Sequence, residues 1–300
     1  MNEITKSGII TICGRPNVGK STLTNALVGE KGAIVSNKPQ TTRNRICGIL
    51  NRGESQFVFV DTPGLHKART RLGDYMVNVV KESVSDVDAV MLLVEPIANI
   101  GGPEQQLIDR IKVLGCPAVL VINKIDEVEK KEELLEIIQL YSQAHEFQAI
   151  VPISARKKEG VDALLDILEG FLQPDPQLFP DDMGTAQPER QVMAEILREK
   201  MLLCLAKEIP HGTAVEITRF VERDDEVIEC DATIYCEKNS HKGIIIGKGG
   251  AMLKKVSTMA RKDMERFMGT KVFLQTWVKV KENWRDNPAA IQNFGYVGDK

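Results

Sequence analysis

The sequence predicts an α/β fold for the N-terminal part of the chain and an α+β fold for the C-terminal part. Up to about residue 172, short apolar runs alternate with helical stretches, which is the pattern of a doubly wound, mostly parallel sheet. A proline-rich segment without apolar periodicity follows, and beyond it the order of helices and strands changes. We therefore expect two domains, at 1–173 and 189–300, with a linker at 174–188.

The apolar runs of the first domain predict strands, and most of them are apolar on both faces, as in a parallel sheet covered by helices. These strands are expected at 8–13, 45–50, 57–61, 89–95, 118–123 and 149–154, and helices between them at 72–84, 104–113, 130–143 and 161–172. Ligands of such sheets bind at the carboxyl ends of the strands. The side chains that follow these runs are therefore the first candidates for a site.

Charge is unevenly distributed along a chain whose formal net charge is −3. Residues 238–285 carry 12 Lys and Arg against 3 Asp and Glu, whereas residues 216–231 carry 7 acidic residues against 2 arginines. The basic block indicates a localised site for a polyanion, with a solvated helix face as the alternative.

Signal-peptide patterns, membrane-length apolar runs and CxxC pairs are absent from the sequence, so we expect a cytosolic protein with reduced thiols.

The first motif lies between the strand at 8–13 and a helix. It reads Gly14-Arg15-Pro16-Asn17-Val18-Gly19-Lys20-Ser21 and fits GxxxxGK[ST], the pattern of a phosphate-binding loop. Its glycines permit tight backbone geometry, so that successive N–H groups can point at phosphate oxygens. We expect Lys20 to reach the β- and γ-phosphates of a nucleotide and Ser21 to bind Mg²⁺.

A second motif, Asp61-Thr62-Pro63-Gly64, ends the strand at 57–61. A carboxylate at this place can hold Mg²⁺, and the N–H of Gly64 can meet a γ-phosphate. Alone this sequence is a common turn. Its position after an apolar strand, 40 residues beyond Lys20, makes it a strong indication of a nucleotide site.

A third motif selects the base. Asn123-Lys124-Ile125-Asp126 follows the strand at 118–123, and Ser154-Ala155 follows the last strand of the domain. The carboxylate of Asp126 can accept hydrogen bonds from N1–H and the 2-amino group of guanine, neither of which adenine offers. Ser154 and Ala155 are placed to support the base, and we expect a guanine nucleotide.

Together these elements resemble the translation-factor-like GTPases. In many GTPases a glutamine follows the glycine of the second motif and positions the attacking water, but Leu65 stands there, so we expect a different mechanism.

Thr42, in the polar segment 36–43, is the candidate that closes on Mg²⁺ and the γ-phosphate. Asn17 is similar to the asparagine of GTPases that bind K⁺ beside the phosphates, which makes K⁺ a candidate cofactor. We expect Lys20, Thr42, Gly64 and Asn17 to act in catalysis, and Ser21, Thr42 and Asp61 to bind the metal.

The second domain is expected to contain a helix at 189–207, strands at 213–220 and 227–236, a helix that includes 242–246, a helix at 251–268 and a strand at 271–280. Before the last helix lies the GxxG sequence Gly247-Lys248-Gly249-Gly250, which can approach a sugar–phosphate backbone. This order resembles a type II KH domain, which clamps about four single-stranded RNA nucleotides. We expect Ile245 and its neighbours to form an apolar wall for the bases. The expected basic surface comprises Lys254, Lys255, Arg261, Lys262, Arg266, Lys279, Lys281 and Arg285, with Trp284 as a stacking ring.

The whole motif set, over roughly residues 5–298, is similar to the Era-like GTPases that end in a type II KH domain. The resemblance implies a factor for assembly of the small (30S) ribosomal subunit that binds single-stranded RNA near the 3′ end of 16S rRNA. It also implies a cytoplasmic monomer with some peripheral contact with the inner face of the membrane. The alternatives are a GTPase that regulates a protein or membrane partner through a docking C-terminal domain, and a passive RNA-binding protein with a relic GTPase domain.

Overall fold

In the computed structural model, the described residues are 4–29, 46–63, 70–82, 87–129, 132–180, 183, 185, 187–205, 209–223 and 225–296. They form two compact units, one made mainly by residues up to 186 and the other mainly by residues from 187 on. Each helix among these residues is too short or too polar to cross a lipid bilayer.

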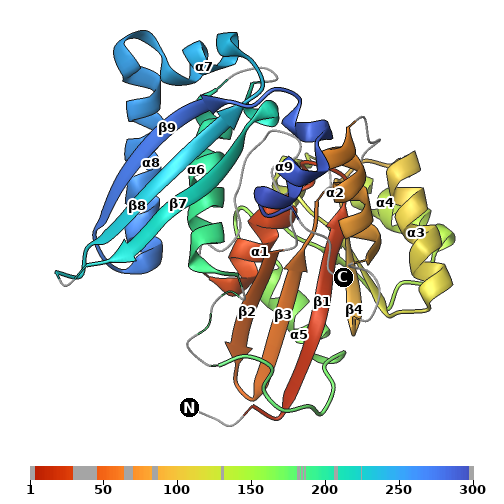
Figure 1. The fold of residues 1–300 in the computed structure, drawn as a ribbon. Coiled ribbons are helices and arrows are strands. Elements are labelled where there is room, and N and C mark those ends of the chain that lie inside the picture. The colour runs from red at the N-terminus through yellow and green to blue at the C-terminus, as the bar shows by residue number, and fades with distance from the viewer. Residues whose placement is uncertain are drawn as a thin grey trace. The chain divides into compact units, whose positions relative to one another are not determined.

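The described strands of the first unit form one sheet in the order β2-β3-β1-β4-β5-β6, of which Figure 1 labels β2, β3, β1 and β4. Their bounds are Lys6–Gly14 (β1), Ile46–Arg52 (β2), Ser55–Asp61 (β3), Ala89–Val94 (β4), Ala118–Ile122 (β5) and Ala149–Pro152 (β6). β2 pairs antiparallel with β3, and the other neighbours are parallel. The prediction of a doubly wound, mostly parallel sheet is therefore confirmed.

Helices cover both faces of this sheet. They are α1 (Lys20–Val28), α2 (Arg71–Glu82), α3 (Gly102–Leu114), α4 (Glu132–Ala144) and α5 (Val161–Glu169). α1 and α5 pack on one set of strand residues, such as Ile10 and Phe57, whereas α3 and α4 pack on the alternate set, such as Leu92 and Leu120. Because both faces are covered, the central strands β4 and β5 are apolar and buried along their whole length, as the sequence indicates.

The described part of the proline-rich segment is attached to the first unit. The side-chain amide of Gln56, in β3, donates to the carbonyl of Phe179 at 2.8 Å, and its oxygen accepts from the N–H of Leu178 at 2.8 Å. Thr185 donates its hydroxyl to the carbonyl of Cys47 in β2 at 2.8 Å. The described residues of this segment form no helix or strand, and hydrogen bonds hold them to the first unit.

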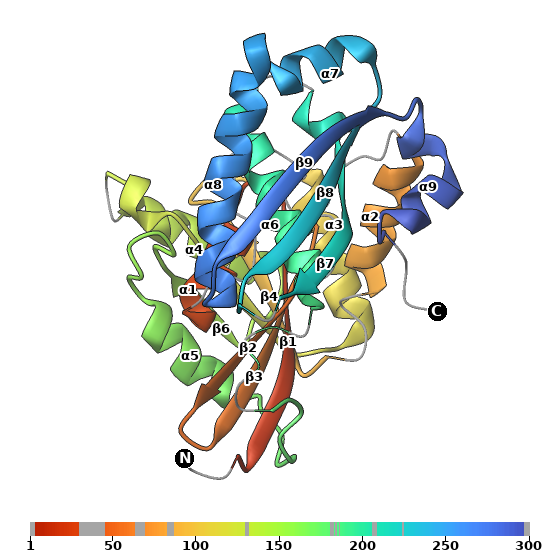
Figure 2. The same cartoon turned by 60° about the vertical axis from the view of Figure 1, so that its left-hand side comes forward.

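The second unit pairs three described strands with helices on one face (Figure 2). The elements are α6 (Glu189–Cys204), β7 (Ala214–Glu222), β8 (Ile228–Cys236), α7 (Asn239–Ile246), α8 (Ala251–Met268), β9 (Val272–Val280) and α9 (Pro288–Asn293), with single helical turns at Pro210–Gly212, Lys248–Gly250 and Trp284–Asp286. β8 lies between β7, which is antiparallel to it, and β9, which is parallel to it. The predicted order of helices and strands, and the α+β class, are confirmed.

Candidate functional site

The nucleotide motifs meet at one edge of the first sheet. β1 ends at Gly14 and β3 ends at Asp61, while Asn123 directly follows β5 and Ser154 comes two residues after β6. These four strands are parallel, so their carboxyl ends lie along the same edge. The topology therefore brings together side chains from widely separated parts of the sequence, at the place where such sheets bind ligands.

Two positions of the phosphate-binding loop require glycine. Gly14 has φ 152°, and a Cβ there would lie 2.3 Å from the carbonyl oxygen of Leu93. Gly19 has φ 102°, and its Cβ would lie 2.2 Å from Nδ2 of Asn123. A side chain at either place would push the loop away from its neighbours. The loop then leads directly into α1, whose N-terminal amides suit an anion.

Lys20 is held inside this loop. Its side chain is buried, and Nζ donates to the carbonyls of Gly14 at 3.2 Å and Arg15 at 2.8 Å. Burial lowers the pKa of Lys20 to about 8, although the charge of Asp61 opposes the shift. The ammonium is thus fixed in the loop, in position for a phosphate that would stabilise its charge.

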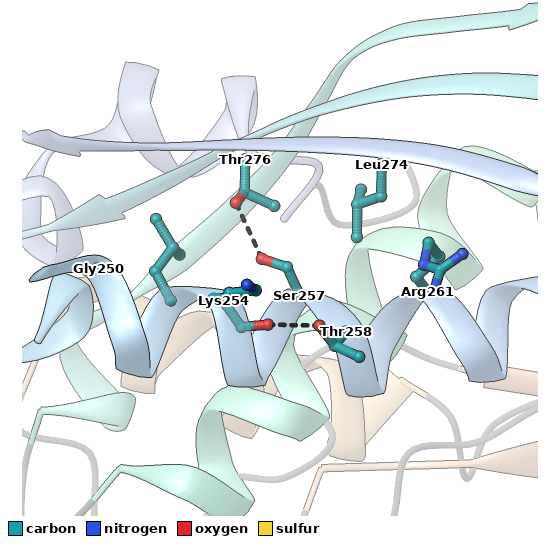
Figure 3. A pocket seen from close by; sticks show the side chains of 8 residues that line it. Gly250, Lys254, Ser257, Thr258, Arg261, Leu274 and Thr276 are labelled. Carbon is teal, nitrogen blue, oxygen red and sulfur yellow. Dashed lines mark hydrogen bonds between the residues drawn. The ribbon is translucent and has the colours of Figure 1, made fainter.

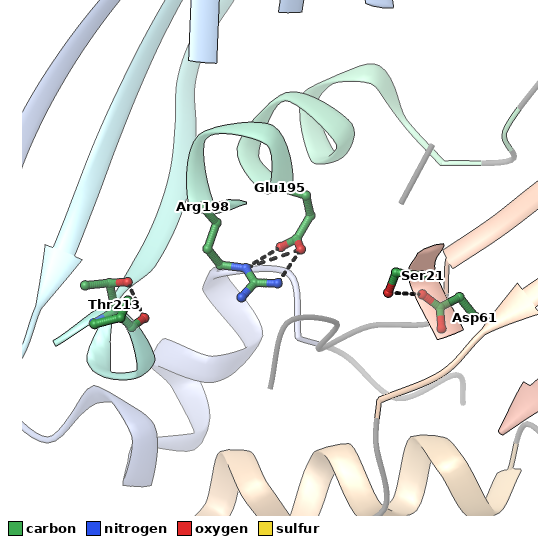
Figure 4. Close-up of polar contacts among 6 residues, drawn as sticks. Ser21, Asp61, Glu195, Arg198 and Thr213 are labelled. Carbon is green, nitrogen blue, oxygen red and sulfur yellow. Dashed lines mark hydrogen bonds and ion pairs between the residues drawn. The ribbon is translucent and has the colours of Figure 1, made fainter. Parts of the chain in front are cut away.

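Ser21 and Asp61 form the candidate metal site. The Ser21 hydroxyl donates to Oδ2 of Asp61 at 2.7 Å, joining the first turn of α1 to the end of β3 (Figure 4). A hydroxyl and a carboxylate are oxygen ligands of the kind that Mg²⁺ prefers, so this donor set fits the ion. Thr62 donates to the carbonyl of Ile12 at 2.8 Å, which fixes the end of β3 against β1. Pro63 is the next residue and is described, whereas Thr42, Gly64 and Leu65 lie outside the described residues.

Asn123 ties the loops of the site to one another. Its Nδ2 donates to the carbonyl of Val18 in the phosphate-binding loop at 2.8 Å. Its Oδ1 accepts from the N–H of Ala155 at 3.0 Å. The amide therefore has its polar groups directed at the backbone of two other motifs, and it holds the phosphate end and the base end of the site in fixed register.

Asp126 is supported as an ionised carboxylate. The Ser154 hydroxyl donates to Oδ1 of Asp126 at 2.6 Å, and this hydrogen bond lowers the pKa of the carboxyl group. Lys124 has φ 65° and directs its ammonium to Glu95 at 2.5 Å. Ile125 donates its N–H to the carbonyl of Ile153 at 3.2 Å. The carboxylate is thus positioned as a charged hydrogen-bond acceptor, which suits the two donors of guanine.

Glu104 is a residue of the site that none of the sequence motifs includes. This residue lies in the first turn of α3, is fully buried, and forms an ion pair with Arg15 of the phosphate-binding loop. An acidic residue in a first helical turn is ordinarily explained by the helix dipole, so nothing in the sequence marks it as part of the site. The pair anchors the residue whose carbonyl accepts from Lys20.

The GxxG sequence of the second unit forms the turn between α7 and α8. Gly247 has φ 73°, and a Cβ there would lie 2.7 Å from Cβ of Met252, so the close packing requires glycine. Gly249 and Gly250 have φ 58° and 81° with open space around the missing side chain. Lys248 is exposed beside them. The turn therefore presents bare backbone and a positive charge to the solvent.

A groove runs from this turn between α8 and β9 (Figure 3). Its volume is about 360 Å³, and its lining residues are Gly250, Leu253, Lys254, Ser257, Thr258, Arg261, Leu274 and Thr276. Ser257 and Thr276 share a hydrogen bond of 2.9 Å across it. Two of the predicted basic residues, Lys254 and Arg261, line the groove, and Lys255 is exposed on the same helix. The groove thus has a basic wall, and two leucines and three hydroxyl side chains also line it.

Two expectations for this surface are wrong. Ile245 is only 1% exposed and packs in the core of the unit, whereas the neighbouring Ile244 is 50% exposed, because consecutive helical residues point in different directions. Ile245 therefore cannot contact a base. Trp284 is fully buried and donates its indole N–H to the carbonyl of Gly212 at 3.0 Å, so it is not a stacking ring; Trp277 is the exposed tryptophan.

Comparisons with known proteins identify a GTPase domain and a KH domain in this chain. The family model described as 50S ribosome-binding GTPase matches residues 9–124, and the KH domain model matches residues 208–285. GTPase Era of Ruminiclostridium cellulolyticum is 49% identical over 295 residues, covering 98% of this chain and 99% of that protein. GTPase Era of Clostridioides difficile is 49% identical over 97% of this chain and 98% of its own length.

Solved structures give the same result. A crystal structure of Era in complex with MgGDPNP and nucleotides 1506–1542 of 16S ribosomal RNA matches with a TM-score of 0.94 at 36% identity, over 98% of this chain and 100% of the other. A variant of Aquifex aeolicus Era bound to GDP and AlF4⁻ matches equally well, with a TM-score of 0.94 at 36% identity over the same shares of the two chains. With its guanine-nucleotide motifs in one unit and its GxxG groove in the other, the chain belongs to the Era family of GTPases.

Proposed function

We propose that this protein is a molecular switch that hydrolyses GTP to GDP and phosphate and binds single-stranded RNA near the 3′ end of 16S rRNA during assembly of the small ribosomal subunit. The observation that carries the proposal is the presence, in one chain, of the Lys20, Ser21–Asp61 and Asp126–Ser154 constellation and of a GxxG groove with a basic wall. The Era structure with MgGDPNP and 16S rRNA nucleotides supports both halves of it.

Hydrolysis depends on positioned charge, because phosphoryl transfer leaves negative charge on the oxygens of the transferred group and of the leaving phosphate. The loop amides and the buried ammonium of Lys20 would contact the β- and γ-phosphates. Ser21 and Asp61 would hold Mg²⁺, which supplies positive charge to the same oxygens when it is bound. The roles of Thr42 and Gly64 rest on the sequence motifs, and Leu65 in place of glutamine means that other groups orient the water.

We also propose K⁺ as a cofactor that supplies the charge an arginine would otherwise provide. Asn17 supports this idea because it is exposed on the phosphate-binding loop, with φ 68°. GTP turnover should be faster in K⁺ than in Na⁺ at equal ionic strength, and Asn17→Ala should remove most of the difference. Equal turnover in the two salts would contradict the assignment.

The base assignment is tested with Asp126→Asn. An amide cannot accept both guanine donors, so the affinity for GTP should fall at least about a hundredfold while xanthosine triphosphate binds better. Titration of both nucleotides measures this shift. Asp162→Asn, an exposed carboxyl of α5, is the matched control and should bind GTP normally. Unchanged GTP selectivity in Asp126→Asn would show that the Asp126 carboxylate does not select guanine.

The RNA assignment is tested with Gly249→Asp. The new carboxylate would stand in open space on the turn and repel a phosphate backbone, so RNA binding should be lost and GTP binding retained. Gly269→Asp is the matched control, because Gly269 also has a positive φ of 68° and open space but lies at the far end of α8. RNA binding by the wild type should weaken steeply with salt. Binding of a protein partner that resists salt and nuclease would favour a docking module instead.

A further inference from the structure

β9 carries a row of exposed side chains that the groove does not use. Its residues alternate, and Leu274, Thr276 and Val278 face α8 and the core. The intervening positions Phe273, Gln275, Trp277 and Lys279 are exposed on the other face of the sheet. Phe273 is 51% exposed and Trp277 is 44% exposed.

Two large rings in one exposed row are unusual on a surface that contacts only water. Phe and Trp gain most from burial among the side chains, and exposed apolar groups that gather in this way mark contact sites. Phe273 and Trp277 are four residues apart, with Gln275 between them, which is about 13 Å along a strand. That spacing is about two nucleotide steps of an extended single strand, so the two rings can meet two bases that are separated by one nucleotide.

Lys279 gives one end of the row a positive charge, and the carboxylate beside the other end is neutralised by arginines. Glu229 of β8 lies beside Phe273, but Arg219 at 2.7 Å and Arg223 at 3.5 Å pair with its carboxylate. Lys279 belongs to the row itself. Two other carboxylates of the described strands lie on this face: Asp231, beside Gln275, and Glu216 of β7, which accepts a hydrogen bond from the Tyr235 hydroxyl at 2.9 Å.

The row is continuous with the groove around the edge of the sheet. β9 is the edge strand among the described strands of this unit, so its outer backbone edge pairs with no other described strand. One face of β9 supplies Leu274 and Thr276 to the groove, and the opposite face supplies Phe273 and Trp277. A single strand that leaves the groove therefore has only the width of β9 to cross before it meets the rings.

We propose that RNA extending beyond the groove continues over the edge of β9 and stacks its bases on Trp277 and Phe273, with Lys279 near the phosphates. Stacking on exposed aromatic side chains, with adjacent lysines for the backbone, is how sheets bind single-stranded nucleic acid without reading its sequence. The inference rests on the proposed RNA binding in the groove and adds a second contact region outside it.

The test compares a short RNA with longer ones of the same core sequence, using the full chain. The short RNA has about four nucleotides, enough for the groove alone, and the longer RNAs are extended on the 5′ or the 3′ side. Trp277→Ala should weaken one of the extended RNAs about tenfold and leave the short RNA unchanged. Trp277→Phe should restore most of the affinity, and Leu203→Ala, an exposed apolar residue of α6, should have no effect.

Tryptophan fluorescence gives an independent readout, because the chain contains only two tryptophans and Trp284 is fully buried. The extended RNA should quench the emission of Trp277 and protect it from acrylamide, and the short RNA should not. Far-UV circular dichroism and the unfolding midpoint establish that each variant is folded.

Three outcomes would overturn the inference. Equal affinity of Trp277→Ala and wild type for every extended RNA would exclude stacking at Trp277. An equal loss for the short and the extended RNA would place Trp277 in the groove itself. Self-association that Trp277→Ala abolishes, without any change in RNA affinity, would assign the row to a second copy of the chain. Failure of the wild type to bind any RNA would instead remove the proposed function on which the inference rests.

Discussion

At the scale of single residues, the nucleotide site depends on charges that the fold keeps out of water. Lys20 is 6% exposed, and burial brings its pKa down from 10.5 to about 8. The ordinary penalty for a buried ammonium is offset in part by Asp61. A phosphate bound in the loop would offset the rest of this penalty. The Lys20 ammonium is therefore stabilised less in the free protein than it would be with a nucleotide bound.

The lowered pKa of Lys20 gives a prediction for nucleotide binding. Above pH 8 the side chain of the free protein is increasingly neutral, whereas the bound phosphates favour the ammonium, so binding takes up a proton. The affinity for GDP should therefore fall as the pH rises from 7.5 to 9.5, by up to about tenfold per pH unit. Lys20→Arg stays charged and is the control, because the nucleotide's own titration is the same in both proteins. Parallel pH profiles for the two proteins would contradict the prediction.

The same pKa determines how the stability of the nucleotide-free protein varies with pH. The folded-state pKa of Lys20, about 8, is below its ordinary value of 10.5. Between these values the unfolded chain binds more protons than the folded one, so this side chain makes the free energy of unfolding rise with pH across that window. Nucleotide affinity and the stability of the free protein therefore change in opposite directions there.

At the scale of elements, α6 shows how little the local sequence says about burial. Arg198, Glu199 and Lys200 form a run of charges that would ordinarily be solvated, yet all three are buried. Arg198 makes a bidentate ion pair with Glu195, at 3.0 and 2.6 Å (Figure 4). Lys200 pairs with Asp263 of α8, so the helix is tied to its neighbour by charge as well as by apolar packing.

The buried pair of α6 predicts a large effect of Glu195→Ala. Removing the carboxylate leaves the buried guanidinium without its bidentate partner, so the free energy of unfolding of the second unit should fall by about 3 kcal/mol. Urea unfolding followed by circular dichroism measures it. Asp225→Ala removes an exposed pair with Arg223 in the same unit and should cost less than about 1 kcal/mol. Similar losses in both variants would show that the buried pair has no special role.

At the scale of the whole molecule, a switch requires that the nucleotide and the RNA influence one another. If a GTP analogue changes the affinity for RNA by some factor, RNA must change the affinity for the analogue by the same factor. We expect the RNA dissociation constants to differ between the protein with GTP analogue, with GDP and without nucleotide. Fluorescence anisotropy of labelled RNA measures them, and titration of labelled nucleotide with and without RNA checks the reciprocity. Equal RNA affinities in all three states would reject the switch.

The sequence predicted the parts of the fold and the site that depend on neighbours along the chain. Helix α8 was expected at 251–268 and has those bounds, because its amphipathic pattern begins after a glycine turn and ends at a glycine. The nucleotide motifs were recognised because each lies directly after an apolar run. In a parallel sheet, a residue that directly follows a strand lies at the carboxyl edge of the sheet, so its location depends little on the rest of the structure.

The sequence could not predict the exposure of a residue where that exposure depends on which face of a strand or helix packs against the rest of the unit. In β9 both sets of alternating positions contain large apolar side chains, with Leu274 and Val278 in one set and Phe273 and Trp277 in the other. The pattern alone does not tell which set faces the helices. Ile244 and Ile245 present the same ambiguity in α7, and the choice is made by α8 and the core behind it.

The sequence by itself determined the fold class, the guanine-nucleotide motifs and the GxxG turn, because glycine geometry and the periods of strand and helix are local properties. Only the tertiary structure decided that Glu104 holds Arg15, that Trp284 is buried, and that Trp277 is exposed. Burial and pairing depend on atoms from distant parts of the chain, and the packing of whole elements brings those atoms together.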